Sequence, residues 1–256
     1  MIGAIAGDMI GSPYEHDPIK TVAFPMVVAD FTDDTVLSVA VADAILHGQD
    51  YGQSIQAFAR QYPNLPYGGS FWHWIWDPNC LPYYSYGNGS AMRVSPVGFA
   101  FESIDMVMDQ ALRTAAVSHN HPEGIKGAQA TALAVFLARK GEDKACIRRQ
   151  IEKWFAYDLG RCLEEIRPVY AFDVTSQGSV PESIIAFLDS KDFESAIKNA
   201  ISLGGDADTM ACIAGAIAQA YYKTIPYDII TQIREKLPPL LLAVVDRFAE
   251  QFNCAY

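Results

Sequence analysis

The 256-residue sequence predicts an all-α fold. Apolar residues recur at helical spacing along the chain, and no stretch alternates apolar and polar side chains as a half-buried strand does. Capping residues and helix breakers stand where such helices would begin and end. Half of the residues are hydrophobic, which is enough for a sizeable core, and no linker or low-complexity segment divides the chain. We therefore expect one compact domain over residues 1–256, an orthogonal helical bundle.

The first third of the chain contains three predicted helices, at residues 2–10, 35–46 and 51–62. Small residues such as Gly3 and Gly7 would let the first helix pack closely against a neighbour. Residues 21–30 should be extended or irregular, because Pro25 argues against a central strand. Residues 63–86 are rich in aromatic residues, proline and glycine, which predicts a loop with at most two helical turns around residues 71–76.

From residue 103 onward the pattern is helical throughout. Helices are expected at residues 103–117, 122–140, 142–155, 180–188, 193–203, 227–236 and 240–252, with a further helix inside residues 202–222. Ser103 is a suitable N-cap, and Asp192 or Ser190 can cap the helix that begins at residue 193. Gly141 is a stop signal, and Pro238-Pro239 divides the last two helices.

Two acidic stretches stand directly before apolar helices. Gly204-Gly205-Asp206-Ala207-Asp208-Thr209 opens a nearly all-apolar helix that we expect to be buried on every side, and Thr32-Asp33-Asp34-Thr35 opens the helix at residues 35–46. If these helix N-termini face each other, four carboxylates converge, and a helix dipole alone does not hold so many like charges together. Their hard oxygen atoms suit Mg²⁺, Mn²⁺ or Ca²⁺ rather than Zn²⁺, and their number favours two ions. The alternative is ordinary N-capping without a metal.

A second candidate binding segment runs from Ser85 to Arg93. Its alternating glycines, Gly87 and Gly89, allow a ligand to approach the backbone, whose N–H groups can cradle a phosphate. Aromatic residues in the preceding segment could stack on a nucleobase or simply cover an edge of the core. His119 and His121 precede a helix, where either could titrate near neutral pH or serve as an ordinary hydrogen-bonding histidine.

Composition excludes several classes of function. The net charge is −11, from 19 basic and 30 acidic residues, which argues against nucleic acid or an anionic membrane as the main partner. Five scattered cysteines indicate reduced thiols in a cytoplasmic protein. The N-terminal stretch lacks the basic region of a signal peptide, and no apolar stretch is long enough to span a bilayer.

These residues together resemble the ADP-ribosylglycohydrolase family, the ADP-ribosyl-acceptor hydrolases. The matching segments, in the family's order, are Gly7-Asp8-Met9-Ile10-Gly11 with Glu15; Thr32-Asp33-Asp34-Thr35; residues 85–93; His119 with Gly124 and Gly127-Ala128; and residues 204–209. The resemblance implies an all-α fold with two Mg²⁺ or Mn²⁺ ions between helix N-termini. It also implies cleavage of the bond between ADP-ribose and an acceptor, with release of ADP-ribose.

The resemblance assigns roles position by position. The metal ligands would be Thr32, Asp33, Asp34, Asp206, Asp208 and Thr209. The substrate-binding residues would be Ser85, Tyr86, Gly87, Asn88, Gly89 and His119. Either Asp34 or Glu15 would be the catalytic carboxylate that activates water. We favour an arginine-type N-glycosidic acceptor over a serine O-glycosidic one, because a guanidine leaving group needs less help from protonation.

Two other functions remain open at the level of sequence. The chain could be a non-catalytic, ADP-ribose-binding or structural member of the family, although its acidic motifs are complete. It could also be a magnesium-dependent hydrolase of another phosphate-containing small molecule. The expected partner is an ADP-ribosylated protein or small-molecule substrate, with no nucleic acid and no membrane.

Overall fold

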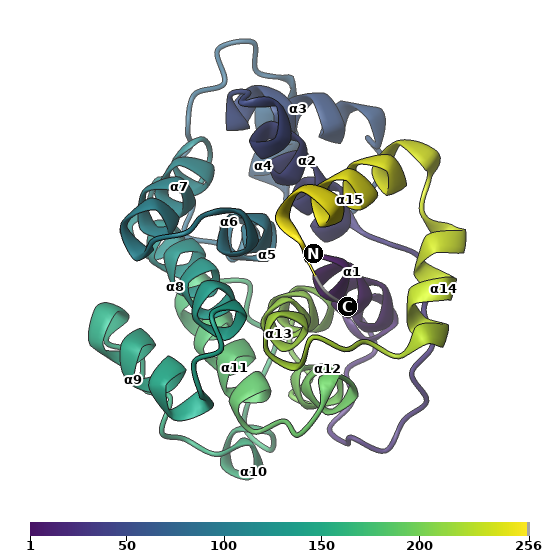
Figure 1. The fold of residues 1–256 in the computed structure, drawn as a ribbon, viewed down its shortest axis with the longest axis vertical. Coiled ribbons are helices and arrows are strands. Elements are labelled where there is room, and N and C mark those ends of the chain that lie inside the picture. The colour runs from purple at the N-terminus through teal and green to yellow at the C-terminus, as the bar shows by residue number, and fades with distance from the viewer. Residues whose placement is uncertain (255–256) are drawn as a thin grey trace.

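The computed structural model describes residues 1–254, which form helices joined by loops (Figure 1). The helices are α1 (Ile2–Gly11), α2 (Asp33–His47), α3 (Tyr51–Gln61), α4 (Gly69–Trp76), α5 (Gly89–Met92), α6 (Ser95–Ala100), α7 (Ile104–Ala116), α8 (Pro122–Arg139), α9 (Lys144–Phe155), α10 (Leu163–Ile166), α11 (Ser176–Leu188), α12 (Phe193–Ile201), α13 (Ala207–Tyr222), α14 (Tyr227–Lys236) and α15 (Pro239–Phe252). Within these residues no strand forms, and the only extended pairing is an isolated antiparallel bridge between Gly87 and Thr175. The prediction of an all-α helical bundle is confirmed.

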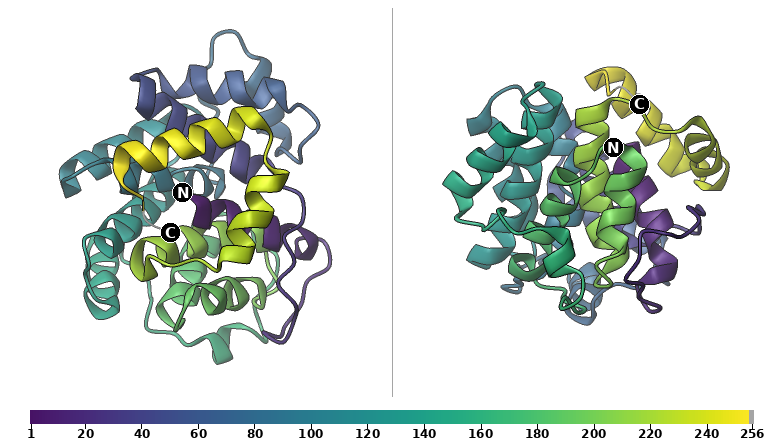
Figure 2. Two further views of the ribbon diagram at one scale, coloured as in Figure 1. Left: turned by 45° about the vertical axis from the view of Figure 1, so that its right-hand side comes forward. Right: turned by 90° about the horizontal axis from the view of Figure 1, so that it is seen from below.

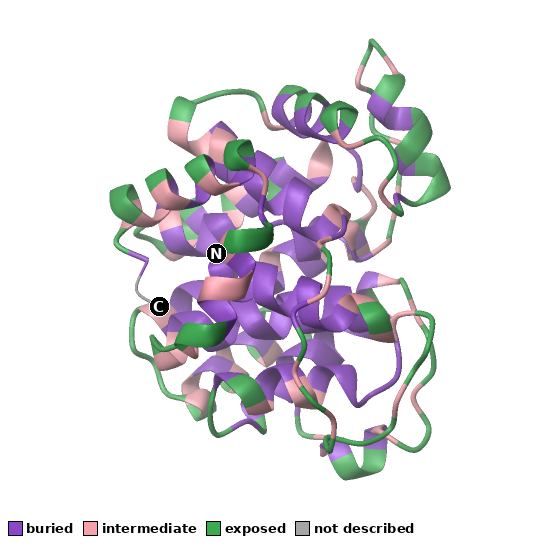
Figure 3. Cartoon of the chain, turned by 90° about the vertical axis from the view of Figure 1, so that its right-hand side faces the viewer, coloured by how far each residue is buried: buried purple, intermediate pink, exposed green. Residues whose placement is uncertain are grey.

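Helix α13 lies at the centre of the bundle, with α1, α8, α11 and α12 packed around it (Figures 1 and 2). Every residue from Ala207 to Ala220 is buried, as expected for a helix without a polar face. Figure 3 shows this buried interior, with exposed residues confined to outer helix faces and loops. The second acidic motif therefore sits at the N-terminus of a helix that is buried along nearly its whole length.

Small residues let α1 and α13 approach until their backbones touch. A Cβ atom on Gly7 would lie 2.0 Å from the carbonyl oxygen of Ala211, and one on Gly3 would lie 2.4 Å from that of Gly215. Both distances are shorter than a real Cβ atom tolerates, so glycine is required at these positions. The close packing predicted for the first helix is confirmed, and it brings the C-terminal half of α1 beside the start of α13.

The structure differs from the sequence prediction mainly in short elements. Helices α5, α6 and α10 have four to six residues and were not predicted, since so short a run carries little periodic signal. Helix α11 begins at Ser176 rather than at residue 180, with Pro181 inside it. The carbonyl group that Pro181 cannot pair with belongs to Gln177, which is exposed and can be solvated there.

Two further expectations concern the chain as a whole. All five cysteines are unpaired thiols, as the sequence predicted. Within residues 1–254, no helix combines the length and apolar character that crossing a bilayer requires.

Candidate functional site

The predicted site residues converge on one cavity of about 580 Å³. It opens where the first turns of α2, α5 and α13 meet. The predicted residues that line it are Glu15, Asp33, Asp34, Ser85, Tyr86, Gly87, Asn88, Gly89, His119, Asp206, Asp208 and Thr209. Thr32 is the one predicted residue that does not line the cavity. Segments separated by nearly two hundred residues thus meet in a single site.

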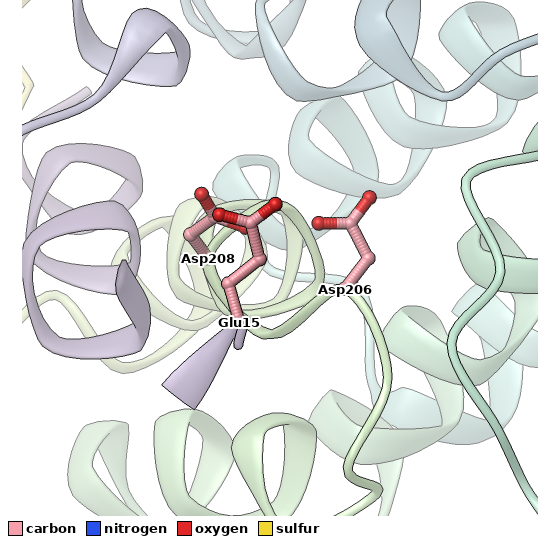
Figure 4. A group of neighbouring side chains, drawn as sticks. All are labelled: Glu15, Asp206 and Asp208. Carbon is pink, nitrogen blue, oxygen red and sulfur yellow. The ribbon is translucent and has the colours of Figure 1, made fainter. Parts of the chain in front are cut away.

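Three carboxylates form the centre of the site. One oxygen atom each from Glu15, Asp206 and Asp208 lies within 4.8 Å of the other two. Figure 4 shows the three side chains grouped together. Asp206 is the N-cap residue of α13 and Asp208 belongs to its first turn, while Glu15 follows the 3-10 turn Ser12–Tyr14 after α1. Both aspartates are buried and Glu15 is partly exposed. This spacing allows a single cation to contact all three.

The first acidic motif meets the second across the cavity. The hydroxyl group of Thr209 donates to Oδ1 of Asp34 at 3.4 Å, so the N-termini of α2 and α13 face each other as predicted. The other oxygen of Asp34, Oδ2, is buried and has no hydrogen-bond partner within the described residues. A buried carboxylate oxygen without a donor is costly, and a bound cation would satisfy it.

Burial and mutual repulsion both act on these carboxylates. Burial raises the pKa of Asp33, Asp34 and Asp206 well above the usual range, and the charge of Asp208 raises the pKa of each further. The pKa of Glu15 is also raised, first by burial and then by Asp208. These carboxylates become charged together more easily when a cation offsets their repulsion. Because all their ligand atoms are oxygen, a divalent metal such as Mg²⁺ or Mn²⁺ fits the cluster.

Capping alone does not account for the motifs. The Thr32 side chain caps α2 by accepting from the backbone N–H of Asp34 at 3.3 Å. Asp206, at the equivalent position of α13, makes no side-chain capping hydrogen bond. N-capping therefore explains Thr32 and leaves the four carboxylates without a structural reason to gather.

Asp8 is a site residue to which the sequence assigned no role. Its buried carboxylate accepts hydrogen bonds from the hydroxyl group of Thr32 at 2.8 Å and from the backbone N–H of Thr35 at 3.1 Å. It also accepts from the backbone N–H of Thr32 and from the hydroxyl group of Thr35. Asp8 therefore anchors the first acidic motif from behind. A single carboxylate inside an otherwise apolar helix was the signal for it.

The segment from Ser85 to Gly89 lines the cavity but is partly occupied by internal hydrogen bonds. The Asn88 side chain donates to Oδ2 of Asp206 at 2.7 Å and to the hydroxyl group of Ser179 at 3.1 Å. Two backbone N–H groups are also engaged, that of Gly87 with Oγ of Ser85 and that of Asn88 with the carbonyl of Val174. Asn88 thus orients a predicted metal ligand, a contact that sequence spacing does not reveal.

The two histidines of the loop before α8 differ in position. His119 is buried against the glycine segment, where a Cβ atom on Gly89 would lie 3.0 Å from its Nε2. Burial, and next the charge of Arg93, hold the pKa of His119 well below its usual range. His121 instead caps α8 by accepting from the backbone N–H of Glu123 at 3.1 Å. The hydrogen-bonding alternative thus describes His121.

Aromatic residues of the loop from residue 63 to 86 divide between the cavity and the core. Phe71, Tyr83, Tyr84 and Tyr86 line the cavity. Trp74 is buried in the core. The segment therefore both walls the site and covers an edge of the core.

Comparison with known proteins identifies the family of this chain. Residues 1–255 match the sequence profile of the ADP-ribosylglycohydrolase family. Human ADP-ribosylhydrolase ARH3 is 28% identical, over 87% of this chain and 84% of that protein. The ADP-ribosylarginine hydrolase Tri1 of Pseudomonas putida is 25% identical, over 87% of this chain and 69% of that protein.

A solved structure shares the fold. It is a chain of an ADP-ribosylglycohydrolase-related protein complex, which superposes with a TM-score of 0.74 over 97% of this chain and 95% of that chain, at 22% identity. The profile match covers the site and the fold together. The chain therefore belongs to the ADP-ribosylglycohydrolase family.

Proposed function

We propose that this protein is a divalent-metal-dependent hydrolase that cleaves the glycosidic bond between ADP-ribose and an acceptor and releases free ADP-ribose. Membership of the family supports a hydrolase of glycosyl bonds. The observation that carries the metal dependence is the gathering of Glu15, Asp206 and Asp208 within 4.8 Å, beside the unpaired buried oxygen of Asp34. The same cavity has room for a nucleotide-sized ligand next to the cluster.

The proposed ligand set for two Mg²⁺ or Mn²⁺ ions is Thr32, Asp33, Asp34, Asp206, Asp208 and Thr209. Ions bound there would supply Lewis-acid stabilisation for the ribose as charge develops at its anomeric carbon. Asp8 and Asn88 would keep the two motifs in place, because each hydrogen-bonds to one of them. Thr32 is engaged with Asp8, and a lone pair of its hydroxyl oxygen remains for a cation.

Glu15 is our preferred residue for activating water. Its side chain is 20% exposed, so it can exchange protons with solvent, whereas Asp34 is enclosed between two helix starts. It stands within 4.8 Å of Asp206 and Asp208, at the edge of the cluster. The water oxygen would bond to the anomeric carbon as the bond from that carbon to the acceptor breaks. Glu15 would take a proton from this water, and the departing acceptor would take up a proton from solvent on its nitrogen or oxygen.

An arginine-linked acceptor is the preferred substrate in this proposal. The net charge of −11 favours a cationic guanidinium at the mouth of the cavity. A guanidine group also leaves with less protonation help than a serine alkoxide. Ser85 to Gly89, with His119, would hold the diphosphate and ribose of the ADP-ribose part.

The test is release of free ADP-ribose from arginine-linked and serine-linked substrates, each with Mg²⁺, with Mn²⁺ and with a chelator. We expect metal-dependent release, faster from the arginine linkage. ADP-ribose binding without release from either substrate would instead identify a non-catalytic binding protein. Release of AMP or inorganic phosphate would identify a hydrolase that acts on a different bond.

A further inference from the structure

Arg93 is a fully buried cation that the proposed reaction does not use. It follows α5 directly and lines the inner wall of the cavity. Its Nη2 donates to the carbonyl oxygen of Thr114 and to the hydroxyl oxygen of Ser118, both at 2.8 Å. Within residues 1–254 the guanidinium has no ion pair with a carboxylate, and its Nε has no hydrogen-bond partner. A buried charge of this kind is costly and calls for an explanation.

The bond from Arg93 determines where the hydroxyl hydrogen of Ser118 points. An arginine side chain can only donate, so Oγ of Ser118 must be the acceptor in that bond. Oγ also lies 2.8 Å from Nδ1 of His119, the one acceptor to which the structure gives this hydroxyl a hydrogen bond within residues 1–254. Ser118 is completely buried, so its hydrogen has no water to meet. It therefore points to Nδ1.

We infer that Arg93, acting through Ser118, holds His119 in the neutral form that carries its proton on Nε2. Since Nδ1 accepts from Ser118, the single imidazole proton must sit on the other nitrogen. Nε2 lies under the glycine segment, 3.0 Å from the position of a Cβ atom on Gly89 and 3.6 Å from that of one on Gly87. His119 is then a fixed hydrogen-bond donor at the cavity and not a catalytic base.

The surroundings of His119 favour this form. The ring packs against Tyr83 at 5.8 Å between centroids, and Arg93 is the charged group that acts on it. A positive neighbour disfavours a second proton on the imidazole, and burial does the same. The hydroxyl dipole of Ser118 is also aligned, with its oxygen toward the cation and its hydrogen toward the ring. Arg93 is thus a positioning residue.

The identity of the group that His119 meets rests on the proposed function. Within that function, Nε2–H would donate to an oxygen atom of the diphosphate or ribose of ADP-ribose. The protonation form of the ring is independent of the proposed function, because contacts within the protein determine that form. The experiment below separates the two.

The protonation form can be measured directly. Full-length protein labelled with ¹⁵N-histidine would give long-range ¹H–¹⁵N spectra that distinguish a protonated from an unprotonated ring nitrogen, and His119→Gln would assign the signal. We expect His119 to carry its proton on Nε2 and to remain neutral from pH 8 to pH 5.5. A proton on Nδ1, or a charged ring within that range, would overturn the inference.

Ser118→Ala removes the hydroxyl group that connects Arg93 with His119 while leaving Arg93 in place. We expect the form protonated on Nδ1 to become populated, and the Kd for free ADP-ribose to rise in proportion to the lost fraction of the form protonated on Nε2, about 2-fold at equal populations. Ser95→Ala is the matched control, since Ser95 is also buried and its hydroxyl has no hydrogen-bond partner within the described residues. It should change neither quantity.

The outcomes separate the inference from the proposed function. If wild-type protein does not bind ADP-ribose, the proposed function fails, and the spectra still decide the protonation form. If Ser118→Ala leaves the protonation form unchanged, Arg93 and Ser118 do not set it. If that form changes while the Kd does not, the donor role of His119 is wrong.

Discussion

Asp8 connects the site to the core at the level of single residues. Its carboxylate receives hydrogen bonds from both the backbone and the hydroxyl groups of Thr32 and Thr35. These contacts fix the first turn of α2, where Asp33 and Asp34 project into the cavity. Residues that orient metal ligands in this way typically change metal affinity when they are replaced.

We predict that Asp8→Asn weakens metal binding more than it weakens catalysis. The amide would replace one acceptor oxygen with an N–H₂ group that faces backbone N–H donors, so the motif would shift. The metal concentration for half-maximal activity should rise about 10- to 100-fold, with much of the rate recovered at saturating metal. A metal titration of activity measures this. An unchanged metal dependence would mean that Asp8 serves only the fold.

Replacement of a proposed ligand should instead reduce activity strongly and stabilise the metal-free protein. Asp208→Asn removes the charge that raises the pKa of Asp33, Asp34 and Asp206, so the metal-free variant should unfold at a higher temperature than the metal-free wild type. Activity should fall about 100-fold or more, because the cluster loses a ligand. Asp33→Asn should act in the same direction.

The matched control is Asp105→Asn. Asp105 is exposed and lies in the first turn of α7, as Asp208 lies in the first turn of α13. Its replacement changes the interaction with the helix dipole and leaves the carboxylate cluster intact. Thermal unfolding and ADP-ribose release would be measured for the variants side by side. Wild-type activity in Asp208→Asn would remove this residue from the proposed ligand set.

At the scale of elements, the pair formed by α1 and α13 determines the site's geometry. Gly7→Ala places a methyl group 2.0 Å from the carbonyl oxygen of Ala211, so the helices must separate. Alanine normally stabilises a helix interior by about 1 kcal/mol relative to glycine, yet here we predict a loss of about 1–3 kcal/mol. Denaturant unfolding measures the sign. Gly69→Ala, whose Cβ would meet nothing within 4 Å, should be neutral or slightly stabilising.

A destabilising Gly7→Ala should also weaken metal binding, because Asp8 is next to it and Asp208 lies across the same contact. A stabilising effect equal to that of Gly69→Ala would show that the helices relax without cost. The prediction therefore tests whether close packing or helix propensity dominates at this position.

Elements with local signals were predictable from the sequence. Ser103 and Asp192 accept from the backbone of the third residue of their helices, as their positions as N-caps predicted, and Gly141 adopts a positive φ of 85° after α8. The start of α11 was not predictable. A proline usually stands in the first turn of a helix, whereas Pro181 is the sixth residue of α11. The fold tolerates this proline because the carbonyl group of Gln177, which loses its hydrogen bond, is exposed, and that exposure is a property of the tertiary structure.

In the site, too, some features had local sequence signals and others depended on the tertiary structure. The two acidic motifs were visible as carboxylates before apolar helices, and the structure brings them together. The contacts of Asn88 with Asp206 and of Arg93 with Ser118 join segments 118 and 25 residues apart, and no periodic pattern encodes them. The charged residues of the site could therefore be predicted from the sequence, whereas the hydrogen bonds that hold them in place could be identified only in the structure.

At the scale of the whole molecule, the carboxylate cluster without bound metal would oppose folding at neutral pH. Burial and mutual repulsion raise the pKa of Asp33, Asp34 and Asp206 above their values in the unfolded chain. Between the unfolded and the folded pKa values, the native protein binds more protons than the unfolded protein does. This contribution therefore favours the native state most below the unfolded value and is lost as the pH rises through the folded values.

We predict that divalent metal stabilises the protein more at high pH than at low pH. Metal ions replace protons on the cluster, so the rise in Tm on adding Mg²⁺ to chelator-treated protein should be larger at pH 8 than at pH 5.5. Thermal unfolding at matched ionic strength, with NaCl in place of MgCl₂ as the control, separates binding from charge screening. In Asp208→Asn the difference between the two pH values should shrink. A metal-induced rise that is equal at both pH values would mean that protons and metal ions do not compete for these carboxylates.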